Sequence, residues 1–107
     1  MDERNAQRLQ AAIPKLAGLV IEVQEFSQIA CIKYTKRFHV ASAPLLFELR
    51  CGDERCTHGG YDITHRVVHA LRAHETRSRG DCQCDGTTGT ANCGRHIHFE
   101  LFAEYRA

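Results

Sequence analysis

Alternation between apolar and polar residues predicts that much of this chain forms β-strands. In residues 19–26, Leu19, Ile21 and Val23 would point to one side of a strand and the polar residues between them to the other. This period of two residues is typical of a half-buried strand. The other segments that we predict to be short strands are 28–34, 37–40, 44–51 and 95–105.

The last of these segments, residues 95–105, alternates most clearly. The side chains that we expect to face the core are Ile97, Phe99, Leu101, Ala103 and Tyr105. The side chains that we expect to face solvent are His96, His98, Glu100 and Glu104, and Phe102 is the exception to the alternation. In residues 44–51 the same pattern places Cys51 on the core side, at the end of a strand.

Residues 61–76 have the pattern of the main helix. Their apolar stripe recurs at three- and four-residue intervals and comprises Ile63, Val67, Ala70, Leu71 and His74. Asp62 or Thr64 can accept hydrogen bonds from the free N–H groups of the first turn. We expect His74, on the apolar side, to be partly buried.

The order of the elements predicts an α+β domain. Residues 1–17 suggest a short N-terminal helical segment, limited by Pro14, and residues 18–107 the α+β core. We expect an antiparallel or mixed sheet with one main helix packed across it. Residues 81–94 are predicted to form an irregular loop before the last strand.

Composition and charge narrow the class of protein. A chain of 107 residues fits a single domain, and 43% apolar with 25% charged residues is ordinary for a globular protein. The formal net charge of +1 argues against a strongly cationic nucleic-acid binder, although a local basic face remains compatible with it. No membrane span or signal peptide is recognisable, so we expect a cytoplasmic protein whose thiols stay reduced.

Six cysteines in a reducing compartment favour metal ligands over disulfides. Two cysteine-bearing loops flank the predicted helix, and they would meet at one end of the sheet if the helix packs antiparallel to its neighbouring strands. Two pairs of cysteines from two such loops are the usual construction of a tetrahedral zinc site. The ligands that we predict for Zn²⁺ are Cys51, Cys56, Cys84 and Cys93.

Other assignments of the cysteines remain open. Cys82 or His58 can replace Cys84 in the ligand set, and Cys31 is expected to be a small buried hydrophobic residue. Reduced, partly buried cysteines without a metal are a second reading. Cys82 and Cys84, separated by one residue, also suggest a disulfide or a redox- or zinc-responsive switch.

The chain resembles a family of small uncharacterised bacterial proteins. The resemblance rests on the runs "CGDERCTHGGYDITHRVVHALR" and "CDGTTGTANCGRHIHF", in roughly the C-terminal half. The positions that match the pattern of the family are Cys51, Gly52, Asp53, Cys56, Gly59, Gly60, Asp62, Cys84, Gly86, Cys93, Gly94 and Arg95. Cys31 and Cys82 lie outside the pattern. The resemblance agrees with Cys84 as the fourth ligand and implies no activity.

Catalytic motifs are weak. His65 and His69 have the spacing of the H-E-x-x-H hydrolases, but Arg66 replaces the glutamate that would act as base. His96 and His98 would lie on the outer face of the last strand. They could bind metal or phosphate, but exposed histidines of a strand usually have no such role. No serine lies in a nucleophile motif and no phosphate-binding glycine loop occurs, so we expect a protein without enzymatic activity.

Two groups of basic residues leave a binding function open. One group, in "KYTKRFH", interleaves aromatic residues with Lys33, Lys36 and Arg37. The other lies on or just after the predicted helix and comprises Arg66, Arg72, Arg77 and Arg79. We also expect Arg55 and Arg95 to offset the charge of the thiolates. The sequence as a whole predicts a zinc-stabilised module that binds an unidentified protein or nucleic acid and no membrane.

Overall fold

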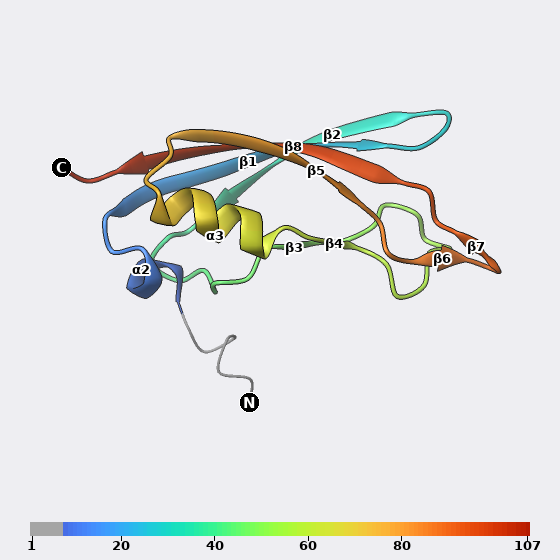
Figure 1. The fold of residues 1–107 in the computed structure, drawn as a ribbon, viewed down its shortest axis with the longest axis horizontal. Helices are drawn as coiled ribbons and strands as arrows, with labels where there is room; N and C mark the ends of the chain where they lie inside the picture. The colour runs from blue at the N-terminus through green and yellow to red at the C-terminus, as the bar shows by residue number, and fades with distance from the viewer. Residues whose placement is uncertain (1–7) are drawn as a thin grey trace.

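The computed structural model describes residues 8–107 of the chain (Figure 1). The prediction of a helical segment over residues 1–17 therefore lies in part outside the described residues. In the described part, α2 is a single short turn of helix, Leu9–Ala12. Strand β1 already begins at Leu16, because Pro14 cannot continue a helix and the chain after it becomes apolar in alternate positions.

The main sheet has four antiparallel strands. They are β1 (Leu16–Phe26), β2 (Cys31–Phe38), β5 (Arg77–Gln83) and β8 (His96–Tyr105). Their order across the sheet is β2-β1-β8-β5, so β1 and β8 lie in the centre and β2 and β5 at the edges. Two small antiparallel pairs complete the strands: β3 (Glu48–Leu49) with β4 (Tyr61–Asp62), and β6 (Thr87–Thr88) with β7 (Ala91–Asn92).

One face of the sheet is covered and forms the core. The central strands bury the alternating apolar residues that the sequence predicted, Leu19, Ile21, Val23, Ile97, Phe99, Leu101 and Ala103. Helix α3 (Thr64–Arg72) contributes Val67 and Leu71 to the same hydrophobic cluster. Figure 1 shows α3 lying along one side of the sheet. The predicted mixture of helix and mainly antiparallel sheet is therefore confirmed.

The main helix is shorter than residues 61–76. Residues Tyr61–Asp62 form β4 instead, and Asp62 accepts a hydrogen bond from the N–H of Thr64 (3.0 Å) as the helix begins. The helix ends at Arg72, and His74 has a positive φ of 55°. The expectation that His74 is partly buried is wrong. It is exposed, and its ring stacks on Tyr105 at a centroid distance of 4.9 Å.

Residues 77–83 form β5, whereas the sequence predicted that an irregular loop begins at residue 81. This strand has no apolar alternation, because one of its faces is exposed and the other carries Gly80 and Cys82. A side chain on Gly80 would lie 2.8 Å from the Arg66 guanidinium carbon, so Arg66 takes the place of an apolar residue there. Compositional patterns do not reveal a strand of this kind.

The predicted strands at 28–34 and 37–40 are one continuous strand, β2. No side chain of β2 is buried, so its sequence does not alternate as an inner strand would. Cys31, predicted to be buried, is exposed at the start of this strand. In the segment 44–51, Phe47 and Leu49 are buried as predicted, but only Glu48–Leu49 pairs with another strand.

No helix within residues 8–107 has both the length and the apolar character needed to cross a membrane.

Candidate metal centre

Four cysteines from two loops meet at one end of the molecule. Cys51 and Cys56 lie in the loop between β3 and β4, and Cys84 and Cys93 lie in the segment between β5 and β8. Their Sγ atoms all lie within 4.8 Å of one another. The loops converge beyond the N-terminal end of α3, at the side of the molecule where Figure 1 shows β6 and β7. The structure thus brings together the four cysteines that the sequence predicted.

The sulfur–sulfur distances match a shared ion and not a disulfide. Cys51 Sγ lies 3.6 Å from Cys93 Sγ, and Cys56 Sγ lies 3.6 Å from Cys84 Sγ. Sulfurs placed about 2.3 Å from a central zinc at tetrahedral angles are about 3.8 Å apart, whereas a disulfide joins them at about 2.05 Å. All four thiols are free. Each close pair joins the two loops, so an ion held here would cross-link segments distant in sequence.

The two loops are also joined by their backbones. Thr57 N–H donates to Thr87 O (2.9 Å), and Thr87 N–H donates to Thr57 O (3.2 Å). Within the second loop, Cys84 N–H donates to Arg95 O (2.9 Å) and Cys93 N–H donates to Gly86 O (3.0 Å). These bonds fix the separation of Cys84 and Cys93, so the nonstandard spacing of the cysteines in sequence does not prevent them from meeting.

Gly59 and Gly86 make room for the sulfur atoms. A Cβ at Gly59 would collide with Cys56 Sγ and lie 2.7 Å from Cys84 Sγ. A Cβ at Gly86 would collide with Cys56 Sγ and lie 2.6 Å from the Cα of Gly59. The loops therefore pack glycine against glycine next to the cluster, a feature that the sequence analysis singled out only through the resemblance.

Substitution of Gly59 by alanine is expected to weaken zinc binding by roughly 10- to 100-fold, the usual effect of disturbing residues that support a metal's ligands. Competition with a chromophoric zinc chelator would measure the change. Gly18→Ala is the matched control, because a Cβ there lies no closer than 3.7 Å to any neighbour. Equal zinc affinity of the Gly59→Ala and Gly18→Ala variants would contradict the close packing of Gly59 on the sulfur atoms.

The thiols differ in acidity because their surroundings differ. Burial raises the pKa of Cys51 to about 11, and it raises the pKa of Cys56 as well. Burial acts in the same direction on Cys84, but hydrogen bonds from the N–H groups of Gly86 and Gly60, and from neighbouring thiols, outweigh it and lower its pKa. The Gly86 N–H lies 3.4 Å from Cys84 Sγ. Cys84 is therefore better prepared than Cys51 or Cys56 to become a thiolate ligand.

A buried carboxylate connects the main sheet to both loops. Glu25 on β1 is only 4% exposed, and it accepts hydrogen bonds from Gly52 N–H (2.9 Å) and from the hydroxyl of Tyr61 (2.7 Å). Its other oxygen lies 3.6 Å from a guanidinium nitrogen of Arg95. Burial, with the adjacent Glu25 carboxylate, raises the pKa of Tyr61, so the hydroxyl keeps its proton and remains a donor.

The sequence analysis did not identify Glu25, which reads as one of the charges of a solvated face. Alternation after Leu19, Ile21 and Val23 places Glu25 on the core side of the strand, and this is the one local sign of its burial. The sequence gives no sign of its partners, because they are at least 27 residues away in the chain. Charged residues are seldom buried unless they are paired. Glu25 is paired, but its partners come from segments distant in sequence.

The two arginines near the cysteines, which the sequence predicted to offset the charge of the thiolates, each pair with a carboxylate. Arg55 is 85% exposed and pairs with Asp53. Arg95 is 21% exposed and pairs with Glu25. The structure thus assigns both guanidinium groups to carboxylates, and Arg95 holds the loop in position through Glu25.

The alternative ligands do not join the cluster. Within the described residues, the group of side chains that could hold a metal comprises the four cysteines and neither His58 nor Cys82. His58 is exposed and has a positive φ of 57°. The Cys82 Sγ lies 3.6 Å from the carbonyl oxygen of Gln83, and burial raises the pKa of this thiol. A raised pKa reduces the thiolate fraction and so disfavours Cys82 as a redox-active residue.

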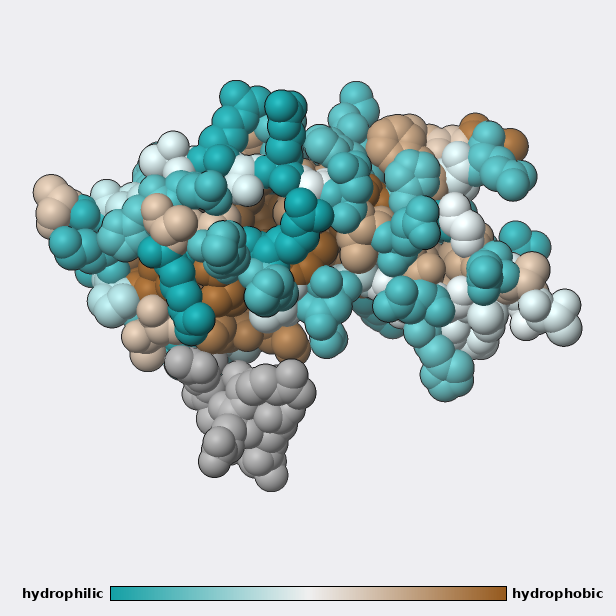
Figure 2. Space-filling view, viewed as in Figure 1, coloured by the Kyte–Doolittle hydropathy of each residue, from teal (hydrophilic) through white to brown (hydrophobic). Residues whose placement is uncertain are grey.

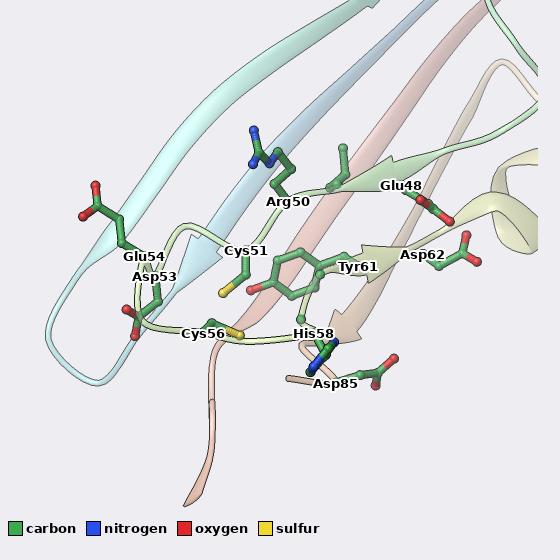
Figure 3. Close-up of a pocket in the computed structure, with 13 residues that line it drawn as sticks. Glu48, Arg50, Cys51, Asp53, Glu54, Cys56, His58, Tyr61, Asp62 and Asp85 are labelled. Carbon is green, nitrogen blue, oxygen red and sulfur yellow. The ribbon is translucent and has the colours of Figure 1, made fainter. Parts of the chain in front are cut away.

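A pocket of about 810 Å³ lies beside the cluster, between the first loop and the β3–β4 pair. Figure 3 shows the side chains of Cys51, Cys56 and Tyr61 close together in this region, with Tyr61 beside Cys51. Carboxylates outnumber basic groups around the pocket, and they are Glu48, Asp53, Glu54, Asp62 and Asp85. Their field favours the approach of a divalent cation to the cysteines.

The histidines of α3 and β8 lie at the surface. His65 and His69 are exposed on α3 and lie outside the buried stripe, as the sequence predicted. His96 is exposed and His98 half-buried, on the outer face of β8.

Neither the scan against protein-family models nor the searches of curated proteins and of solved structures gave a match to this chain.

Proposed function

We propose that this protein is a zinc-stabilised binding module without catalytic activity. The observation that carries the proposal is the meeting of four cysteine sulfurs, from two loops, at the spacing of a tetrahedral site. Sets of four thiolates with tetrahedral geometry suit zinc or iron, and zinc is the metal usually found where the site serves structure alone.

The arrangement favours a structural over a catalytic ion. Four protein sulfurs fill all four positions of a tetrahedral metal, whereas catalytic zinc sites keep one position for water or substrate. A metal here would join the β3–β4 loop to the β6–β7 segment. A structural zinc can contribute on the order of 10 kcal/mol to folding, which is comparable with the net stability of a small domain.

The resemblance to the family agrees with this ligand set. The cysteines that meet are those of the family pattern described above, whereas Cys31 and Cys82 lie outside both the pattern and the cluster. We therefore propose membership of that family. Thiolate ligands survive best in a reducing compartment, and for this reason we place the protein in the cytoplasm.

Zinc titrated into the metal-free protein at pH 7 is expected to bind one ion per chain and to release protons. The thiols of Cys51 and Cys56 have raised pKa values, so both are protonated at neutral pH and must lose their protons to become ligands. Affinity should accordingly fall as the pH is lowered. Calorimetric titrations in buffers of different ionisation enthalpy measure both the stoichiometry and the number of protons. Binding without proton release would contradict thiolate coordination.

A further inference from the structure

We propose that the outer face of the main sheet binds single-stranded nucleic acid. This inference concerns a surface separate from the cysteine cluster, and it names the partner that the proposed binding function leaves unspecified.

The outer face is open across all four strands. Strand pairing aligns its side chains in four rows, which are Arg37–Val20–Phe102–Arg77, Thr35–Glu22–Glu100–Arg79, Lys33–Gln24–His98–Asp81 and Cys31–Phe26–His96–Gln83. None of these residues is buried, and all lie on the side opposite the core. In Figure 2, long hydrophilic side chains stand over the sheet at the top of the view, away from the helix. Among the described residues, nothing covers this face.

Cations outnumber carboxylates on the face, four to three. Glu100 is neutralised locally by Arg77 (2.9 Å), and Asp81 is engaged in a hydrogen bond with His98 (3.1 Å). Within residues 8–107, no carboxylate lies at ion-pair distance from the basic residues of the rim, which are Lys33, Arg37 and Arg79. Among the described residues, Glu22 has no basic partner within ion-pair distance. Lys33 and Arg37 lie along β2, where they would follow a phosphate backbone.

Aromatic groups on the face can receive bases. The rings of Phe26 and His96 stack in adjacent strands at a centroid distance of 5.1 Å and an interplanar angle of 17°. At the other end of the face, the Arg77 guanidinium lies 5.4 Å from the ring centroid of Phe102. Aromatic rings and guanidinium planes are the groups on which unstacked bases pack. Together with a basic rim, they form the features of a single-strand binding sheet.

A second copy of the chain is a less suitable occupant. Although β2 is an unpaired edge, antiparallel pairing of two β2 strands would bring the basic side chains of both copies together, including Lys33, Lys36 and Arg37. Like charges on neighbouring strands oppose such pairing, and edge lysines are a common protection against it. The same charges attract a polyanion.

Fluorescence anisotropy with labelled single-stranded oligothymidylate and oligouridylate, each about 12 nucleotides long, tests the proposal on the full zinc-loaded chain. Binding is expected to weaken with salt. The double variant Lys33→Ala/Arg37→Ala should bind at least roughly tenfold more weakly than the unaltered protein. The slope of log affinity against log salt should become less steep by about 1.4, which corresponds to two lost phosphate contacts. Phe26→Leu should weaken binding roughly fivefold or more, with little change in charge.

The control double variant is Lys15→Ala/Arg72→Ala, which also removes two exposed cations but none from this face. It should bind like the unaltered protein. The proposal is overturned if neither probe binds in a salt-dependent manner, if the control loses as much affinity as the test variant, or if a duplex of equal length binds better. It is also overturned if the protein sediments as a dimer and the Phe26→Leu variant as a monomer, because the face would then be buried between two copies. Zinc content measured on the same samples distinguishes a failure of the sheet to bind nucleic acid from a failure of the cysteines to bind zinc.

Discussion

Replacement of Cys84 by serine is expected to abolish zinc binding and to lower the free energy of unfolding by several kcal/mol. The Sγ of Cys84 lies 3.6 Å from the Sγ of Cys56, on the other loop, and accepts a hydrogen bond from the N–H of Gly86. Removing one thiolate from a four-sulfur site leaves an incomplete shell, and the stabilisation from a structural zinc, on the order of 10 kcal/mol, is then largely lost. Zinc content by atomic absorption and urea unfolding would measure the two effects.

Cys82→Ser is the matched control. Cys82 lies two residues from Cys84 and is half-buried, but it does not belong to the cluster. This variant should retain one zinc and nearly all of its stability. If Cys82→Ser lost the metal and Cys84→Ser kept it, the ligand set would be wrong.

Truncation of Glu25 to alanine should destabilise the protein by about 3 kcal/mol and weaken zinc binding, because a buried group paired with a charge is costly to remove. The change would leave the Tyr61 hydroxyl and the Gly52 N–H without their acceptor and would release Arg95 from its partner. Gly52 follows a predicted ligand directly, so the position of Cys51 is expected to loosen. Urea unfolding with and without zinc gives the size of both effects.

Glu22→Ala is the control for this variant. It removes a carboxylate from the same strand, three residues away, but Glu22 is exposed and should change stability by no more than about 0.5 kcal/mol. A double-mutant cycle between Glu25→Ala and Tyr61→Phe should show a coupling of about 1 kcal/mol or more, because the two side chains are in direct contact. If the free-energy changes of the two substitutions were simply additive, Tyr61 and Glu25 would not interact as described.

The cysteine cluster was predictable from the sequence because its signal is chemical. Cysteines in two short loops on either side of one helix have a limited set of roles. The loops that carry Cys51, Cys56, Cys84 and Cys93 flank one helix, so their convergence followed from the order of the elements. The inner strands were predictable for a similar reason, since one-sided burial produces alternation in β1 and β8.

The remaining features depend on contacts between distant segments. Strand β5 was missed because Arg66 and Gly80 replace the apolar packing that would mark an inner strand. The boundary of α3 was misplaced because Tyr61 and Asp62 pair with β3. Glu25 looked like a surface charge because each of its partners comes from another part of the chain. Sequence patterns report the periodicity of burial within a segment, and none of these contacts is local.

The network around Glu25 also joins the two parts of the molecule to which functions are proposed here. Glu25 lies on β1, and its neighbour Phe26 belongs to the outer face of the sheet and stacks on His96. The same glutamate holds the backbone beside Cys51. Loss of the metal is therefore expected to disturb the end of the sheet nearest to the loops first.

The mass of the native protein, compared with the mass of the same chain after denaturation in acid, tests most directly whether the four sulfurs hold one ion. An excess equal to one zinc per chain is expected, and it should disappear in the Cys84→Ser variant and persist in Cys82→Ser. Equal native and denatured masses of the freshly purified, reduced protein, or a mass lower by two hydrogens for each pair of cysteines, would contradict the proposed metal site.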